Sequence, residues 1–118
     1  MSAESDLYAL LDAHVGLAAQ VGERIYPDAL PEDCTYPALV FARVGSETIV
    51  GISGQRFGEF VDFRIETWAR TRLAADAAAI QVDTCLTAAG DPPSGRSAGF
   101  DPETGLYAAI IEVRRLAT

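Results

Sequence analysis

The segment from Phe60 to Trp68 alternates apolar and polar side chains without interruption. One face carries Val61, Phe63, Ile65 and Thr67, and the other carries Asp62, Arg64 and Glu66. Because successive side chains of a strand point to opposite faces, this pattern predicts a strand that is buried on one side and wet on the other. Half-buried strands of this kind are typical of antiparallel sheets covered on a single face.

The neighbouring segments predict three further parts of such a sheet. The run Ala38–Val44 is apolar throughout, as expected of a covered strand. Leu106–Leu116 alternates again and predicts a last strand, with Phe100 on a short strand pairing back across a turn. Gly90–Gly99 has the composition of a loop. Four glycines between Gly45 and Gly58 indicate a long, mobile hairpin arm.

Helical spacing predicts two main helices. The first begins at Ser5 as N-cap and ends near Gly16, with one further turn stopped by Gly22. The second runs from Arg72 to Ala88 with Thr71 as its cap. One face of the second helix gathers Ala75, Ala78, Ala79, Val82, Cys85 and Leu86, and an opposite stripe carries Leu73, Ala77 and Ile80. The opposite stripe must meet either the N-terminal helix or another subunit.

The order of these elements is helix, strand, strand, helix, strand, strand. It predicts an α+β fold, an antiparallel sheet of about four strands with two main helices packed on one face. The 118 residues fit a single domain, and a hydrophobic content of 49% supplies its core. The proline-containing stretch Glu23–Pro37 is expected to be a surface connector, and Tyr36-Pro37 is a candidate for a cis bond.

The composition argues against several functional classes. A formal net charge of −8 and scattered basic residues disfavour nucleic acid and anionic membrane surfaces as partners. The N-terminal stretch lacks the pattern of a signal peptide, and no apolar run approaches the ~20 residues of a membrane span. Cys34 and Cys85 match no zinc or redox spacing and are expected to be reduced thiols.

No catalytic, cofactor or metal site is predicted. His14 has no sequence signal that adds an orienting residue to a Cys–His pair, and is expected to end the first helix. Asp62 and Glu66 share a strand face with Arg64, which favours a cross-strand charge ladder over acid–base catalysis. The DPETG stretch fits a tight turn better than a calcium loop.

Four stretches, taken in order, resemble one known family. They are LYALLDAHVGLAAQVGERIYP, YPALVFARVG, FVDFRIETWARTRLAADAAAIQVDTCL and GLYAAIIEVR. In this order and spacing they resemble the tail-completion, or tail-to-head joining, proteins of siphophages and prophages. The resemblance covers roughly Leu7 to Arg114, and its main local features are Arg24-Ile25-Tyr26-Pro27, Tyr36-Pro37 and Thr67-Trp68-Ala69.

The resemblance implies a structural role without cofactor or active site. Such proteins are thought to form a ring, commonly of six subunits, that ends the tail tube and meets the head connector. The implied partners are therefore the tail tube protein, the head connector protein and further copies of the chain. The implied locations are the bacterial cytoplasm during assembly and then the virion tail. The alternatives are a small acidic interaction or regulatory module and a small ligand-binding domain.

A closed ring needs two different patches on each subunit. The candidate interface residues are Leu73, Ala77 and Ile80 on the later helix and Ile49, Val50, Ile52, Arg56 and Phe57 in the arm. An exposed sheet edge is a further candidate. DNA passing through such a ring would be repelled by a lumen lined with acidic side chains.

Overall fold

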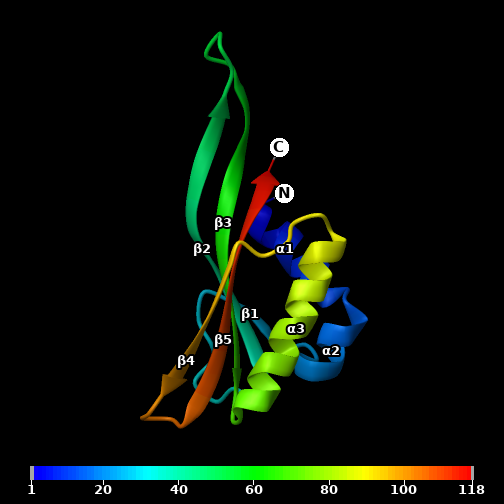
Figure 1. Ribbon diagram of the computed structural model, residues 1–118, viewed down its shortest axis with the longest axis vertical. Coiled ribbons are helices and arrows are strands. Elements are labelled where there is room, and N and C mark those ends of the chain that lie inside the picture. The colour runs from blue at the N-terminus through cyan, green and yellow to red at the C-terminus, as the bar shows by residue number, and fades with distance from the viewer. Residues whose placement is uncertain (1, 118) are drawn as a thin grey trace.

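The computed structural model describes residues 2–117, apart from the side chains of Arg56 and Phe57. Its elements are α1 (Ala3–Asp12), α2 (Val15–Val21), β1 (Ile25–Pro27), β2 (Ala38–Val50), β3 (Arg56–Ala69), α3 (Arg72–Ala88), β4 (Gly95–Asp101) and β5 (Leu106–Ala117). One sheet holds all the strands, and the three helices cover the same face of it (Figure 1). The α+β fold with helices on one side is therefore confirmed.

The sheet has five strands in the order β1-β2-β3-β5-β4. All neighbouring pairs are antiparallel except β1 and β2, which are parallel. The predicted antiparallel sheet of about four strands is thus correct in its centre and incomplete at both edges. Five strands and three helices replace the four strands and two main helices that the sequence predicts.

The core lies between the sheet and the helices. The inward residues predicted for β3, Val61, Phe63, Ile65 and Thr67, are all buried. The face predicted for α3 is also buried through Ala75, Ala78, Val82, Cys85 and Leu86. Leu7 and Leu11 of α1, with Leu17 and Val21 of α2, complete the cluster. The inward residues recur at every second position in the strands and at about every 3.6 positions in the helices, and together they form one apolar layer.

The N-terminal region differs from the prediction in three ways. Ser2, not Ser5, caps α1, and its hydroxyl accepts a hydrogen bond of 3.1 Å from the Ser5 N–H. The first helix ends at Asp12 instead of near Gly16. His14 begins α2 as its N-cap, so it does not complement the carboxyl end of α1. The stop at Gly22 is confirmed, with a φ of 60° that glycine adopts without strain.

β1 lies in a segment predicted to be irregular, and β4 begins in one. β1 falls within the expected connector, and its three residues pair with Leu39–Phe41 of β2. β4 begins in the expected loop 90–99 and extends through Phe100, the residue predicted to pair back. The predicted tight turn after it is confirmed, because the Gly105 N–H donates to the Asp101 carbonyl at 2.8 Å. The Tyr36-Pro37 bond is cis.

β2 and β3 continue as a two-stranded hairpin beyond the rest of the sheet (Figure 1). The last pairing of β3 with β5 is Glu59 with Ala117, whereas β2 and β3 stay paired to Val50 and Arg56. The tip closes where the Gly51 N–H donates to the Gln55 carbonyl at 2.8 Å. The predicted hairpin in residues 45–58 is therefore present, and we call the part from Thr48 to Gly58 the arm.

Candidate interaction surface

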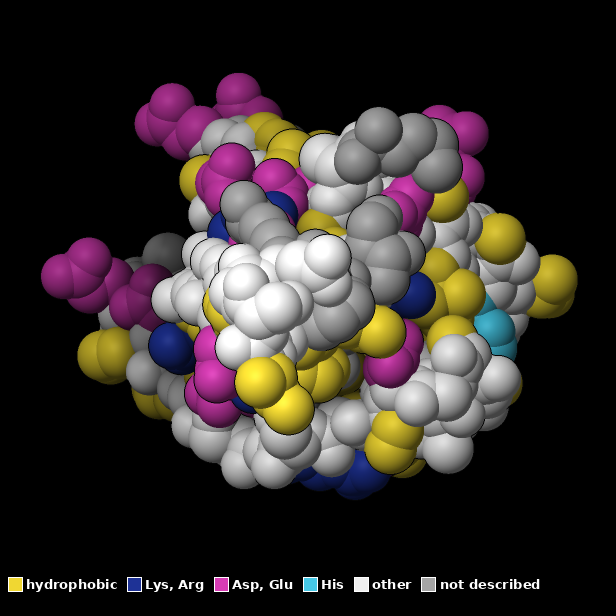
Figure 2. Space-filling view, turned by 90° about the horizontal axis from the view of Figure 1, so that it is seen from above, with side chains coloured by type: hydrophobic (Ala, Val, Ile, Leu, Met, Phe, Trp, Pro, Cys, Tyr) yellow, Lys and Arg dark blue, Asp and Glu magenta, His cyan; other side chains and the backbone are white. Residues whose placement is uncertain are grey.

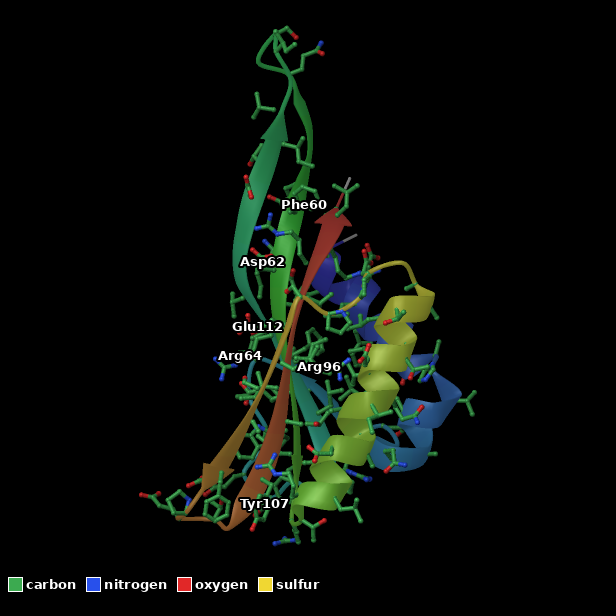
Figure 3. All side chains as sticks on the ribbon, viewed as in Figure 1. Phe60, Asp62, Arg64, Arg96, Tyr107 and Glu112 are labelled. Carbon is green, nitrogen blue, oxygen red and sulfur yellow. The ribbon has the colours of Figure 1, made fainter. Side chains whose placement is uncertain are left out.

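The sheet face opposite the helices carries a ladder of charged side chains, which we call the open face. The Arg114 guanidinium binds both carboxylate oxygens of Asp62, at 2.8 and 3.0 Å, and one oxygen of Glu47 at 2.9 Å. Arg64 pairs with Glu66 at 3.0 Å. Figure 3 shows Asp62, Arg64 and Glu112 on the side away from the helices. The predicted cross-strand charge ladder is thus confirmed for Asp62, whereas Glu66 pairs with Arg64 of its own strand.

The geometry of this ladder is that of ion pairs and not of an acid–base pair. The hydrogen bonds from Arg114 lower the pKa of Asp62 below its ordinary value. A general acid needs the opposite, a raised carboxyl pKa, to hold a proton near neutral pH. Arg114 also stacks over the Phe60 ring, with its central carbon 5.2 Å from the ring centre. Ion pairing and stacking therefore hold the charged side chains of the open face in defined positions.

The arm presents apolar side chains that its own chain leaves uncovered. Val50 keeps 58% of its surface exposed, Ile52 is fully exposed, and Ile49 is half-buried. The predicted interface residues Arg56 and Phe57 have side chains outside the described part of the structure. Apolar residues on a projecting hairpin gain little from folding of the isolated chain. They are therefore suited to contact with a partner.

The outer stripe of α3 is a second apolar surface. Leu73 and Ile80 are 81% and 59% exposed, and Ala77 between them is half-buried. Of the two coverings considered for this stripe, the N-terminal helix is ruled out for Leu73 and Ile80 by this exposure. An open groove of about 240 Å³ runs between this side of α3 and the sheet. Its walls include Ala79, Ile80, Arg96, Ser97 and Ile110.

β4 borders this groove, and the sequence analysis predicted it only in part, as a short strand at Phe100. Arg96 on β4 forms an ion pair with Asp83 of α3. Arg72 of α3 donates to the carbonyls of Gly99 on β4, at 3.0 Å, and of Ala108 on β5, at 2.8 Å. These contacts hold the strand at the sheet edge. No local sequence pattern reveals these contacts, because each joins residues that are far apart in the chain.

His14 and Cys85 lie beside the same small groove, yet the site does not favour nucleophilic chemistry. Burial raises the pKa of the Cys85 thiol, which donates to the Leu10 carbonyl at 3.5 Å. A cysteine nucleophile requires a lowered pKa instead. The His14 Nε2 lies 3.3 Å from the Gln81 Oε1 and so links α2 to α3. Both residues act in packing here.

Within residues 2–117, no cluster of three or more His, Cys, Asp or Glu side chains is placed to hold a metal ion. Among the described helices, none is both long and apolar enough to cross a membrane. Seen from the end that carries the arm, carboxylates project at several places of the outline (Figure 2). The candidate surface of this protein therefore consists of exposed apolar patches and acidic side chains.

Comparison with known proteins decides the family. The family described as tail completion protein gp17 matches residues 5–117. The chain belongs to the tail completion protein gp17 family. The protein is therefore a structural protein of the bacteriophage tail-completion type, as the resemblance in its sequence indicates. No curated protein matches the chain.

One similar solved structure is described as "Virion of native gene transfer agent (GTA) particle". The two chains share 21% sequence identity and superpose with a TM-score of 0.72. The match covers 94% of this tail completion protein and 90% of the other chain. At this identity the likeness is one of fold, and it extends over nearly the full length of both chains.

Proposed function

We propose that the protein completes the tail of a phage or phage-like particle by forming a ring at the head-proximal end of the tail tube. In this role it ends tube growth and offers a surface to the head connector. The family match over residues 5–117 carries the proposal. The protein would assemble in the bacterial cytoplasm and remain in the virion tail.

The exposed patches support an assembly role. The apolar arm and the outer stripe of α3 lie on different parts of the molecule, as heterologous contact in a ring requires. The arm is the natural candidate to order against the tube or a neighbouring subunit. Flexible segments that order on binding are common in assembling proteins.

The open face is the candidate lining of a lumen. Its charged residues are Glu47, Asp62, Glu66 and Glu112 against Arg64 and Arg114, so carboxylates predominate. The arginines are held by ion pairs with these carboxylates, which reduces their availability to phosphate groups. A surface of this kind lets DNA pass without binding it.

The test is electron microscopy of the purified protein mixed with tail tubes that lack their completion protein. We expect a ring at one end of each tube, and head joining when heads are added. A variant in which residues 50–56 are replaced by Asn-Gly shortens the arm and should fold but not join tails. Tubes that stay uncapped with the intact chain would contradict the function. Normal joining by the shortened variant would contradict only the role of the arm.

A further inference from the structure

The sheet ends in two free strand edges on opposite sides. β4 is the outermost strand on one side, with no further strand beyond it among residues 2–117. On the other side, β1 covers β2 at Leu39–Phe41, and within the described part of the chain no strand pairs with the edge of β2 from Ala42 to Val50. Free edges expose unpaired backbone groups and invite pairing with another chain.

The outward backbone groups of β4 follow from the contacts of Arg72. One guanidinium group reaches the carbonyls of both Gly99 and Ala108, so both carbonyls lie between β4 and β5. Gly99 and Ala108 are cross-strand partners, and this position is therefore a hydrogen-bonded pair. Since hydrogen-bonded and non-hydrogen-bonded pairs alternate, the outward groups belong to Arg96, Ala98 and Phe100.

The same reasoning gives the outward groups of β2. The Leu39 N–H donates to the Arg24 carbonyl at 2.9 Å, and the Phe41 carbonyl accepts from the Asp28 N–H at 2.8 Å. Leu39 and Phe41 thus point away from β3, and alternation continues this to Arg43. A bulge between Arg43 and Gly45 adds one residue. Beyond it the outward groups belong to Ser46 and Thr48.

We propose that β4 of one copy pairs antiparallel with the open edge of β2 in a second copy, an inference that rests on the ring proposed above. Three observations favour a second copy as the occupant. β4 has 7 residues, which fits the open stretch from Ala42 to Val50. Within the sheet, β2 and β4 run in opposite directions, so two copies facing the same way pair antiparallel. The outward groups recur at every second residue on both edges.

Side-chain orientation agrees with this pairing. Ser46 pairs with the buried Val61, and Ala98 pairs with the buried Ala109, so both side chains stand on the helix side of the sheet. Ser46 placed opposite Ala98, with Thr48 opposite Arg96, keeps the helix side continuous from one copy to the next. The added strand would lie beside the groove and the exposed Ile80, and would cover part of the outer stripe of α3.

The offset between the edges is compatible with closure into a ring. Ser46 pairs with Val61 of β3, which in turn pairs with Arg115 of β5, whereas Ala98 pairs with Ala109 of β5. Measured along β5, Ser46 and Ala98 are therefore six residues apart. Six residues correspond to about 20 Å along a strand, and the four strands β2, β3, β5 and β4 are about 19 Å wide. Closure then tilts the strands by about 45° from the ring axis, near the roughly 35–45° found in closed sheets.

Disulfide trapping tests which edges meet. In a Cys34→Ser, Cys85→Ala background, single Ser46→Cys and Ala98→Cys variants carrying tags of different size are mixed and oxidised. We expect the mixed disulfide to exceed the yield of a Ser5→Cys control, whose exposed position on α1 reports random collisions. An excess of Ala98→Cys self-dimer would mean that two β4 edges pair about a two-fold axis. That result, or a mixed yield no higher than the control, would overturn the proposal.

A backbone substitution separates pairing from folding. Ala98→Pro removes an N–H that points away from β5, so the β4–β5 ladder keeps its hydrogen bonds. Ala98→Val retains the N–H and serves as the matched control. The disulfide is then trapped at the neighbouring proposed pair, Thr48→Cys with Arg96→Cys, and the substitution at Ala98 is carried on the Arg96→Cys chain. With an unchanged circular dichroism spectrum, we expect Ala98→Pro to lower the yield of this mixed disulfide by about tenfold or more, the equivalent of one or two lost hydrogen bonds. Equal yields for the two variants would overturn the pairing.

Electron microscopy of the same variants distinguishes failure of this inference from failure of the proposed function. If the unmodified chain caps tail tubes and Ala98→Pro does so equally well, the edge pairing is wrong and the function stands. If the unmodified chain caps no tubes, the proposed function itself is wrong, whatever the disulfide yields show. Capping by Ala98→Val but not by Ala98→Pro supports both.

Discussion

Arg114 joins two strands and the base of the arm through one guanidinium group. Its hydrogen bonds hold the pKa of Asp62 below the usual range, and they also reach Glu47. We predict that Arg114→Gln raises the pKa of Asp62 toward its ordinary value, measured by NMR titration of the carboxyl carbon. Arg64→Gln, which removes the partner of Glu66, is the control and should leave that pKa nearly unchanged.

The same pair predicts how stability depends on acid. The pKa of Asp62 is lower in the folded chain than in the unfolded chain. The contribution of this carboxylate to the unfolding free energy is therefore fully present above its pKa in the unfolded chain, and it is lost as the pH falls through its pKa in the folded chain. The difference in unfolding free energy between the wild type and Asp62→Asn should therefore shrink as the pH is lowered below the unfolded value. A difference that grows on acidification would contradict this account.

Thr67 is the buried polar residue of the inner face of the sheet. Its hydroxyl donates to the Ala75 carbonyl at 2.9 Å and lies 3.3 Å from the Ala109 carbonyl. It thus joins the start of α3 to β3 and β5. We predict that Thr67→Val lowers the unfolding free energy by about 1 kcal/mol, measured by urea denaturation. The control is Thr84→Val, whose exposed hydroxyl bonds Ile80 within one helix and should matter less.

Among the elements, α3 has one side that packs in the core and one exposed side that is a candidate contact surface. Leu86 is fully buried, whereas Ile80 is 59% exposed. We predict that Leu86→Ala costs about 2–5 kcal/mol of unfolding free energy. Ile80→Ser should change that free energy by no more than about 0.5 kcal/mol and weaken self-association. Denaturation and sedimentation velocity measure the two effects, and a large stability loss from Ile80→Ser would place that residue in the core.

The elements predicted well are those whose own residues reveal a buried face. α3 has the predicted bounds because Thr71 caps it, with the Ala74 N–H donating to its hydroxyl at 3.1 Å. β3 was evident from its strict alternation. In both cases the local pattern and the tertiary packing agree, which is what makes a segment readable from sequence.

The strand that was missed, β1, and the strand that was predicted only in part, β4, are both defined by what lies beside them. β1 is three residues ending in Pro27, and its parallel partner is more than ten residues away in the chain. β4 was predicted only as a short strand at Phe100, because the glycines and exposed residues before Phe100 give no alternation to detect. The arm and the outer stripe of α3 were predicted as interface residues. The β4 edge needed coordinates, because outward hydrogen-bonding groups leave no trace in composition.

The whole molecule is elongated, about 52 Å in its longest extent, because the arm continues past the body of the sheet. A projecting arm adds little to the stability of one copy, since its apolar side chains stay in water. In the proposed ring, the arm would contact the tail tube or a neighbouring copy, and its apolar side chains would be covered only in that assembled state.

The net charge of −8 opposes that assembled state and makes it dependent on salt. Copies brought side by side repel over a Debye length, which shrinks from about 30 Å at 0.01 M to about 8 Å at 0.15 M ionic strength. We predict that self-association strengthens as NaCl rises over this range, measured by sedimentation equilibrium. Glu32→Arg with Asp33→Arg, in the exposed connector, should reduce this salt dependence by lowering the charge of each copy.

The opposite salt response would carry a definite meaning. If added salt weakened association, paired charges across the contact would have to outweigh the general repulsion between acidic copies. The β4–β2 pairing relies on backbone hydrogen bonds and apolar contact with Ile80, both of which salt screens little. Association that is favoured by salt and abolished by Ala98→Pro would therefore assign the contact to the sheet edges and the barrier to net charge.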